Sequence, residues 1–225
     1  MPVSKARLGG LAAAAALILA TPAAAAVIAA STFDDGAEGW LDGDFTVGNS
    51  TGPVAYDPAG FITVADAFPY NAFLAPAAFR GDQRAANRGT LSFDLGDDLN
   101  DGDVVTALVT FRSAGQLYYG GVVTTPPAAS GFTHYEIVIS AATFLLGDPG
   151  LLTGTQVSEA AFAEALRHVD QLAINADFHS GEDAARLDNV VLTSGAVPEP
   201  AAWALAVTGF GVMGAALRRG GRAAA

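Results

Sequence analysis

Ser50 is the residue whose setting most resembles that of a catalytic nucleophile. It lies in GNSTG (Gly48 to Gly52), which matches the G-x-S-x-G pattern that presents a serine on a sharp turn between a strand and a helix. Pro53 and Pro58 follow closely, with a strand-like VAY between them, whereas the pattern needs a helix after the serine. We therefore interpret the match as accidental and predict no catalytic residue in this chain.

The three histidines, His134, His168 and His179, could act as general bases or metal ligands. Their spacing ties none of them to Ser50, and the chain has no HxxxH or HExxH pair. We expect His134 to point out of a strand, His168 to lie on the polar face of a helix and His179 to lie in a loop. The sequence predicts that they are solvated or locally hydrogen-bonded.

The acidic segment GDDLNDGD, from Gly96 to Asp103, resembles a calcium-binding EF-hand loop in composition. Such a loop needs oxygen ligands at its third and twelfth positions. Counted from Asp97, these positions hold Leu99 and Leu108. The segment is better interpreted as an acidic turn between two strands.

Period-two alternation dominates the middle of the chain and predicts many short strands. The alternating segments are TLSFDL, DVVTALVTF and HYEIVIS, and further apolar runs are separated by Gly, Asn, Asp and Pro turns. A single segment, SEAAFAEALRHVDQL, has helical spacing at Phe162, Leu166 and Val169 after a Ser158 cap. We predict a mainly β protein: an antiparallel sandwich with one short helix.

Several segments between residues 33 and 192 resemble the laminin B domain. They are FDDGAEGW, NAFLAPAAFRGDQRAANRGTLSFDL, SEAAFAEALRHVDQLAINADF and LDNVVL. That family has a jelly-roll-like β-sandwich found in extracellular matrix proteins, related in architecture to carbohydrate-binding modules, and it is not known as an enzyme family. The resemblance implies a non-catalytic, laminin B-like domain over residues 27–196.

Sandwiches of this architecture commonly hold a structural Ca²⁺ where the first and last strands meet, through hard oxygen ligands. Asp34, Asp35 and Glu38 lie near the first predicted strand, and Asp188 lies in the last. We expect Asp34 and Asp188 to be the ligands, with backbone carbonyls completing the shell. The alternative is that these acids only protect the sheet edges from pairing with other molecules.

Exposed aromatic side chains would be the platforms for a sugar ring, since they offer flat apolar area at little cost in entropy. Tyr118 and Tyr119 are consecutive, so in a strand they face opposite sides and one could be exposed. Phe68, Pro69 and Tyr70 fall in a predicted loop. Packing in the core or in a loop is the alternative for each, and the sequence does not identify the ligand-binding residues.

The two ends of the chain predict export. Residues 1–26 carry Lys5 and Arg7, an apolar run and an A-x-A cleavage pattern, which are the parts of a secretory signal peptide. Residues 201–217 carry no charge and are just long enough as a helix to cross the hydrocarbon core of a membrane. The arginines that follow predict a cytoplasmic C-terminus by the positive-inside rule.

The C-terminal segment 197–222 resembles the PEP-CTERM sorting signal of Gram-negative bacteria. The resemblance rests on Pro198, Glu199 and Pro200, the Gly-rich apolar span, and Arg218 and Arg219. It implies recognition by an exosortase, a membrane enzyme thought to cut near the Pro-Glu-Pro and pass the protein to the cell surface. The transmembrane helix would then be a transient anchor, and exopolysaccharide or a surface protein would be the final partner.

The charge of the chain narrows the class of partner. Of its 23 acidic residues, 22 lie between Val27 and Val197, with only six of the 11 basic ones. Such a surface repels nucleic acid and anionic lipid, whereas calcium and neutral glycans approach it more easily. We therefore expect a non-catalytic component of the cell envelope or biofilm matrix that binds glycan or serves a structural or adhesive role. The alternative is a secreted hydrolase acting on polysaccharide or ester substrates.

Overall fold

The computed structural model describes residues 25–65, 70–98, 105–179 and 183–195, all of which fall within one compact unit, Ala24–Val197. No helix among these residues is both long enough and apolar enough to cross a membrane. Nearly all of the predicted signal peptide, and all of the predicted span and sorting signal, lie outside the described residues.

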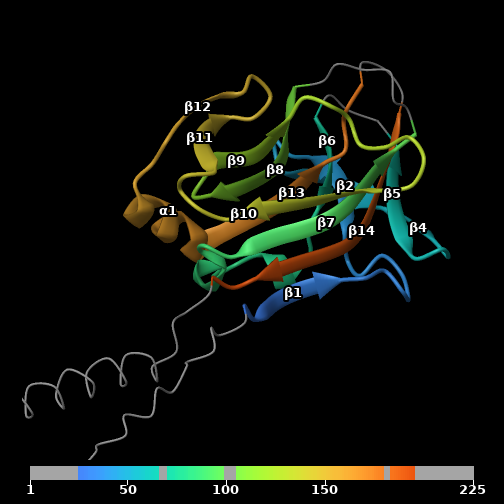
Figure 1. The fold of residues 1–225 in the computed structure, drawn as a ribbon, viewed down its shortest axis with the longest axis horizontal. Helices are drawn as coiled ribbons and strands as arrows, with labels where there is room; N and C mark the ends of the chain where they lie inside the picture. The colour runs from blue at the N-terminus through green and yellow to red at the C-terminus, as the bar shows by residue number, and fades with distance from the viewer. Residues whose placement is uncertain (1–24, 66–69, 99–104, 180–182, 196–225) are drawn as a thin grey trace, which may run out of the picture. The chain divides into compact units, whose positions relative to one another are not determined.

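The described residues form two antiparallel sheets, as Figure 1 shows. The six-stranded sheet has the order β10 (Thr133–Val138), β7 (Thr90–Asp97), β14 (Ala184–Thr193), β5 (Phe61–Ala65) and β4 (Ala55–Asp57), and β1 (Val27–Ser31) also pairs with β14. The eight-stranded sheet has the order β12 (Thr153–Thr155), β11 (Phe144–Asp148), β9 (Gln116–Val123), β8 (Thr106–Ser113), β13 (Val169–Asn175), β6 (Asn71–Leu74), β2 (Leu41–Asp44) and β3 (Asn49–Pro53). The prediction of a mainly β antiparallel sandwich with one short helix is confirmed.

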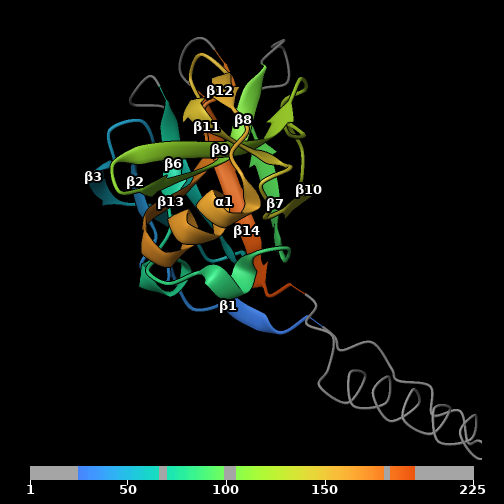
Figure 2. The same cartoon turned by 90° about the vertical axis from the view of Figure 1, so that its left-hand side faces the viewer.

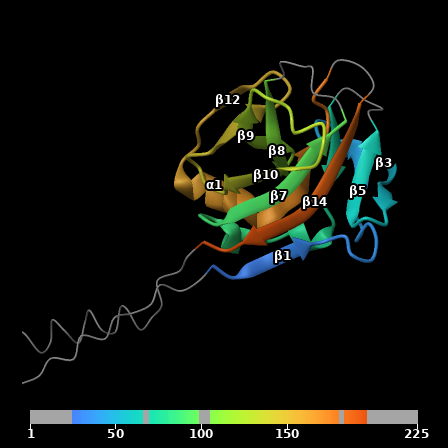
Figure 3. The same cartoon turned by 45° about the vertical axis from the view of Figure 1, so that its right-hand side comes forward.

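Strand β14 changes partner along its length. Ala184–Leu187 pairs with β5, whereas Val190–Thr193 pairs with β1, and β7 lies along its other side (Figure 3). The register of the β7 pairing shifts between Asp188 and Val191. Asn189 lies in this bulge with φ of 51°, a left-handed conformation that Asn adopts more readily than most residues.

The core fills the space between the sheets with aromatic side chains. Phe111 and Tyr118 are stacked with ring centroids 4.7 Å apart, and Phe162 meets Phe111 edge-on at 5.8 Å. Trp40 is buried as well, and its Nε1 donates a 2.9 Å hydrogen bond to Ser31 Oγ. Phe111 and Tyr118 lie on neighbouring strands of the eight-stranded sheet and Phe162 lies on the helix, whereas the Trp40 hydrogen bond reaches β1 of the six-stranded sheet.

One α-helix, α1 (Glu159–Ala165), forms among the described residues, and it is shorter than its apolar spacing predicts. Ser158 caps it, as expected, by accepting a 3.2 Å hydrogen bond from Ala161 N. A 3₁₀ turn, η3 (Leu166–His168), follows, and Val169 opens β13 rather than continuing the helix. The strand prevails there because Val169 N donates to the carbonyl of Gly81.

Two further 3₁₀ turns, η1 (Ala77–Phe79) and η2 (Arg84–Ala86), connect β6 to β7. They lie with α1 at one end of the sandwich, as Figures 1 and 2 show. A backbone hydrogen bond of 2.7 Å from Gln83 N to Leu166 O joins the two segments. This end of the molecule is therefore closed by helical turns, and the hollows described below are formed by other loops.

Leu91 in β7 is fully buried, whereas Leu151 is 68% exposed. We predict that Leu91→Ala lowers the free energy of unfolding by about 2–5 kcal/mol, because it removes buried methyl groups and leaves a cavity. Leu151→Ala, the matched control, should change it by less than about 0.5 kcal/mol. Urea unfolding of both variants checks this, and equal effects would place Leu91 outside the core.

Candidate functional site

A groove of about 530 Å³ lies on the outer face of the eight-stranded sheet. Its floor includes Arg112 of β8 and Leu117 of β9, which are paired across the two strands. Their neighbours Phe111 and Tyr118 point into the core, so Arg112 and Leu117 face away from it. The complete lining is Thr46, Val47, Tyr70, Arg112, Gly115, Leu117, Gly147 and Asp148.

The groove carries one cation and one carboxylate. Arg112 Nη2 donates to the backbone oxygen of Thr46, which fixes the guanidinium beneath the turn between β2 and β3. Arg112 Nε is buried and has no hydrogen-bond partner among the described residues. Asp148 Oδ1 accepts a hydrogen bond from Gly150 N at 2.9 Å. The groove can therefore offer both donors and acceptors to a polar ligand.

Tyr70 borders this groove and is held in an unusual conformation. Its φ is 76°, which is strained for a bulky side chain. Its backbone N donates a 2.9 Å hydrogen bond to Asp177 Oδ2, and its ring meets Phe45 edge-on at 5.5 Å. A Cβ at Gly150 would lie 2.5 Å from the Tyr70 ring, so only glycine lets the ring rest there. The surroundings fix the ring in place while leaving Tyr70 36% exposed.

Among the tyrosines proposed as sugar platforms, Tyr118 and Tyr119 are buried, at 5% and 1% exposure. Tyr118 packs in the main core, and the Tyr119 ring lies against Gly154 of β12. Tyr70 is the candidate that remains at the surface. Phe68 and Pro69 lie outside the described residues.

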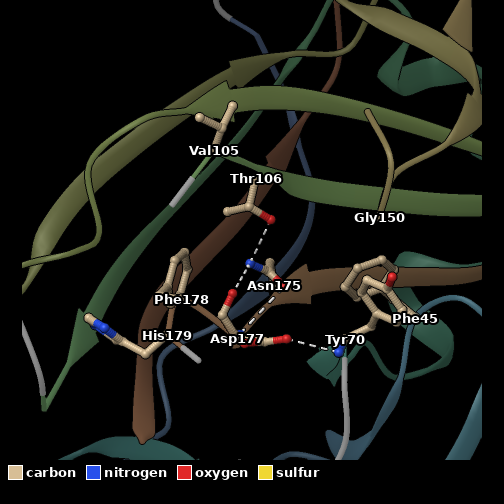
Figure 4. A pocket seen from close by; sticks show the side chains of 9 residues that line it. All are labelled: Phe45, Tyr70, Val105, Thr106, Gly150, Asn175, Asp177, Phe178 and His179. Atoms are coloured by element: carbon tan, nitrogen blue, oxygen red, sulfur yellow. Dashed lines mark hydrogen bonds between the residues drawn. The ribbon is translucent and has the colours of Figure 1, made fainter. Parts of the chain in front are cut away.

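Tyr70 also borders a smaller pocket of about 220 Å³, shown in Figure 4. Within it, Asn175 Nδ2 donates to Thr106 Oγ1 at 3.2 Å and to the backbone oxygen of Asp177 at 2.9 Å. His179 lies at its far side, with its imidazole directed away from Asn175. The pocket is lined by Phe45, Tyr70, Val105, Thr106, Gly150, Asn175, Asp177, Phe178 and His179.

His179 does not behave as the sequence predicts. It follows β13 in a loop, but its side chain is only 5% exposed, and its Nε2 lies 3.4 Å from Oδ2 of the fully buried Asp97. Asp183 completes a group of three whose possible ligand atoms all lie within 4.8 Å of one another. His179 therefore lies in a loop, as predicted, but of the two predicted settings the solvated one is excluded, because the loop folds its ring inward against the end of β7.

The acidic segment from Gly96 leads from β7 to β8, as the prediction of a connection between two strands requires, but its first two residues belong to β7. Strand β7 continues through Asp97, which is buried, while Asp98 Oδ1 accepts a 2.9 Å hydrogen bond from Ala184 N. Residues 99–104 lie outside the described part of the chain. Asp97, His179 and Asp183 come from separate strand ends, so no spacing in the sequence reveals their cluster.

The structure brings the predicted calcium ligands, Asp34 and Asp188, into one electrostatic neighbourhood. Burial raises the pKa of Asp188, and the carboxylates of Asp94 and Asp34 raise it further, against a hydrogen bond from Asn189 N. That hydrogen bond is 2.7 Å long, and Asp34 Oδ2 accepts one of equal length from Thr32 Oγ1. Three carboxylates thus gather where β1 ends beside the bulge of β14.

The other acids near the first strand serve the backbone or face solvent. Glu38 Oε1 accepts hydrogen bonds from Phe33 N at 2.7 Å and Thr32 N at 3.2 Å, which fixes the loop after β1. Asp35 is exposed. These contacts give no support for Glu38 or Asp35 as a calcium ligand.

Ser50 and the remaining histidines show no catalytic arrangement. Ser50 lies in β3 rather than on a strand-to-helix turn, and its hydroxyl donates to the Gly52 carbonyl at 3.4 Å. His134 is 62% exposed and pairs with Asp94, with Nδ1 and Oδ1 2.6 Å apart. His168 is exposed in η3. The exposed positions predicted for His134 and His168 agree with the structure.

The two packed antiparallel sheets place this chain in the class of β-sandwich domains. Residues 72–207, more than half of the chain, match the laminin B (Domain IV) family, and the chain belongs to that family.

Its structure is similar to the L4b domain of human laminin alpha-2, with a TM-score of 0.61 at 13% identity over 74% of this chain and 96% of that one. The solution structure of CtCBM11 matches with a TM-score of 0.40 at 16% identity, over 76% and 97% of the two chains. No curated protein matches the chain in sequence. The laminin B fold is compatible with a non-catalytic binding or structural domain.

The raised pKa of Asp188 predicts a pH dependence of stability. Because the folded state holds this proton above the ordinary pKa of 3.8, the contribution of Asp188 to stability falls as pH rises from that value through the raised pKa. With chelator present, Asp188→Asn should flatten this part of the plot of stability against pH. At pH 7 its free energy of unfolding should equal that of the wild type or exceed it by less than about 1 kcal/mol. Thermal unfolding between pH 3 and 8 measures it. Asp35→Asn is the control, and an identical effect there would contradict the prediction.

If Ca²⁺ binds at Asp34 and Asp188, Asp188→Asn should be less stable than the wild type in excess Ca²⁺, the reverse of the result expected with chelator. Excess Ca²⁺ should stabilise the wild type relative to chelator, by about 2.7 kcal/mol at 100 times the Kd. Asp188→Asn should lose this gain, because the ion loses a charged oxygen ligand. Calorimetry checks both, and an unfolding temperature of the wild type that is the same in Ca²⁺ and chelator would exclude the site.

Proposed function

We propose that the chain is a non-catalytic protein of the cell surface or extracellular matrix whose sandwich binds glycan. The observation that carries this proposal is the groove on the outer face of the eight-stranded sheet, with the partly exposed Tyr70 fixed at its edge. A structural or adhesive role at the same surface would use the same domain, with a protein in place of glycan.

The chemistry of the groove suits an uncharged sugar chain. The Tyr70 ring offers an apolar face on which a pyranose ring can stack, and its fixed conformation keeps the entropy cost of binding low. Arg112 and Asp148 add a donor and an acceptor for hydroxyl groups. The acidic domain around them disfavours polyanions, including nucleic acid.

For localisation, we propose export across the inner membrane of a Gram-negative bacterium, followed by sorting to the cell surface. The sequence of residues 1–26, with its cations, apolar run and A-x-A pattern, supports the first step. Pro198, Glu199, Pro200, Arg218 and Arg219 support recognition by an exosortase-like enzyme, with the helix at 201–217 as a transient anchor whose C-terminus is cytoplasmic.

Glycan binding is tested by pull-down of the full-length chain with the exopolysaccharide of its own host, with and without Ca²⁺. We predict saturable binding that Tyr70→Ala weakens about five-fold or more, because stacking on an aromatic ring contributes about 1 kcal/mol. Tyr56→Ala is the matched control, since Tyr56 is 37% exposed but lies in β4 of the other sheet. Absence of binding by the wild type would shift the proposal to a structural or protein-binding role.

Sorting is tested by the intact mass of the chain recovered from the cell surface. We predict loss of the residues that follow the Pro-Glu-Pro, and accumulation of the uncut chain in the inner membrane when Pro198, Glu199 and Pro200 are all replaced by alanine. A surface protein that retains Ala201 to Ala225 would refute processing.

A further inference from the structure

Asp97, His179 and Asp183 form a buried group that neither the groove nor the predicted calcium site uses. Asp97 ends β7, His179 follows β13, and Asp183 directly precedes β14. Asp97 is 0% exposed and Asp183 5%, and the His179 side chain is 5% exposed. Their possible ligand atoms all lie within 4.8 Å of one another. We propose that these three side chains hold a divalent transition metal ion of the zinc type.

The distance between His179 and Asp97 fits two ligands of a tetrahedral ion. Zinc binds histidine nitrogen and carboxylate oxygen at about 2.0–2.2 Å, so two ligands of a tetrahedral site lie roughly 3.3–3.6 Å apart. Nε2 of His179 and Oδ2 of Asp97 are 3.4 Å apart. A direct charge-assisted hydrogen bond between them would instead draw them to about 2.7–2.9 Å.

The balance of charge also favours a divalent ion. Two carboxylates in a buried place are costly to ionise unless positive charge compensates them. A protonated His179 would supply one positive charge, whereas a divalent ion beside a neutral imidazole compensates both carboxylates.

The donor types select the metal. Calcium and magnesium prefer oxygen ligands alone, whereas an imidazole together with carboxylates suits zinc and its neighbours in the first transition row. Phe178 N lies 3.4 Å from Asp183 Oδ2 and donates to it, which helps to orient that carboxylate. Three protein ligands leave a fourth position for water or for a group of a bound molecule.

Such an ion would join the two sheets of the sandwich. Asp97 belongs to the six-stranded sheet, His179 follows a strand of the eight-stranded sheet, and Asp183 begins the return to the first. The chain contains no cysteine, so no disulfide can make this link. Because the ligands come together only in the folded chain, the free energy of metal binding would add to the stability of the fold.

The test uses the full-length chain loaded with ZnCl₂ and then freed of excess metal. We expect about one zinc ion per chain by mass spectrometry of the metal content. X-ray absorption at the zinc edge should show one imidazole and light oxygen or nitrogen ligands at about 2.0–2.2 Å. Excess Ca²⁺ should not displace the ion, which separates this site from the one predicted at Asp34 and Asp188.

Three variants locate the ion by competition with a chelator. His179→Gln and Asp183→Asn should each weaken zinc binding at least about ten-fold, a loss already typical of removing an outer partner of a ligand. His134→Gln, which alters an exposed histidine paired with Asp94, should bind zinc like the wild type. The proposal is overturned if the wild type holds no stoichiometric zinc, if His179→Gln binds it unchanged, or if His134→Gln loses it equally. Should a variant fail to fold, the wild type still tests the proposal. An X-ray absorption spectrum that shows no imidazole bound to zinc overturns it.

Discussion

Strand β14 pairs with three strands that are distant from it in sequence, and the rest of the six-stranded sheet depends on this pairing. Its first half lies beside β5, its second half beside β1, and β7 runs along its other edge. Between the two halves, the register of the pairing with β7 shifts at the Asp188–Asn189 bulge. Without the bulge, the two halves could not both present Leu187 and Leu192 to the core, because a shift of one residue turns a side chain to the opposite face.

The same bulge concentrates negative charge at the surface. Burial of Asp188 raises its pKa, and the carboxylates of Asp94 and Asp34 raise it further, so the geometry that completes the sheet also creates an electrostatic cost. His134 and Asn189 offset part of that cost by contacting Asp94. A cation at this place would offset more, which is the physical basis for expecting calcium here.

The hollows of the molecule arise where strands of the eight-stranded sheet end. Tyr70 lies between the groove and the smaller pocket, held by Phe45, Gly150 and Asp177, which come from three separate loops. The buried group of Asp97, His179 and Asp183 adjoins the smaller pocket through His179. The sandwich thus acts as a rigid scaffold that positions polar side chains on loops at the strand ends, which is where binding residues are commonly found.

Local patterns in the sequence were sufficient to predict the class of fold and the type of its main elements. Alternation in the segments around Leu91 and Val109 predicted strands, Ser158 predicted the cap of the helix, and LDNV predicted the last strand, because these features depend on neighbouring residues. Only the tertiary structure decided which side chains meet. It buried Tyr118 and Tyr119, left Tyr70 at the groove, ended the helix before Val169, and brought His179 against Asp97. These outcomes depend on contacts between strand ends far apart in the chain, for which local periodicity carries no signal.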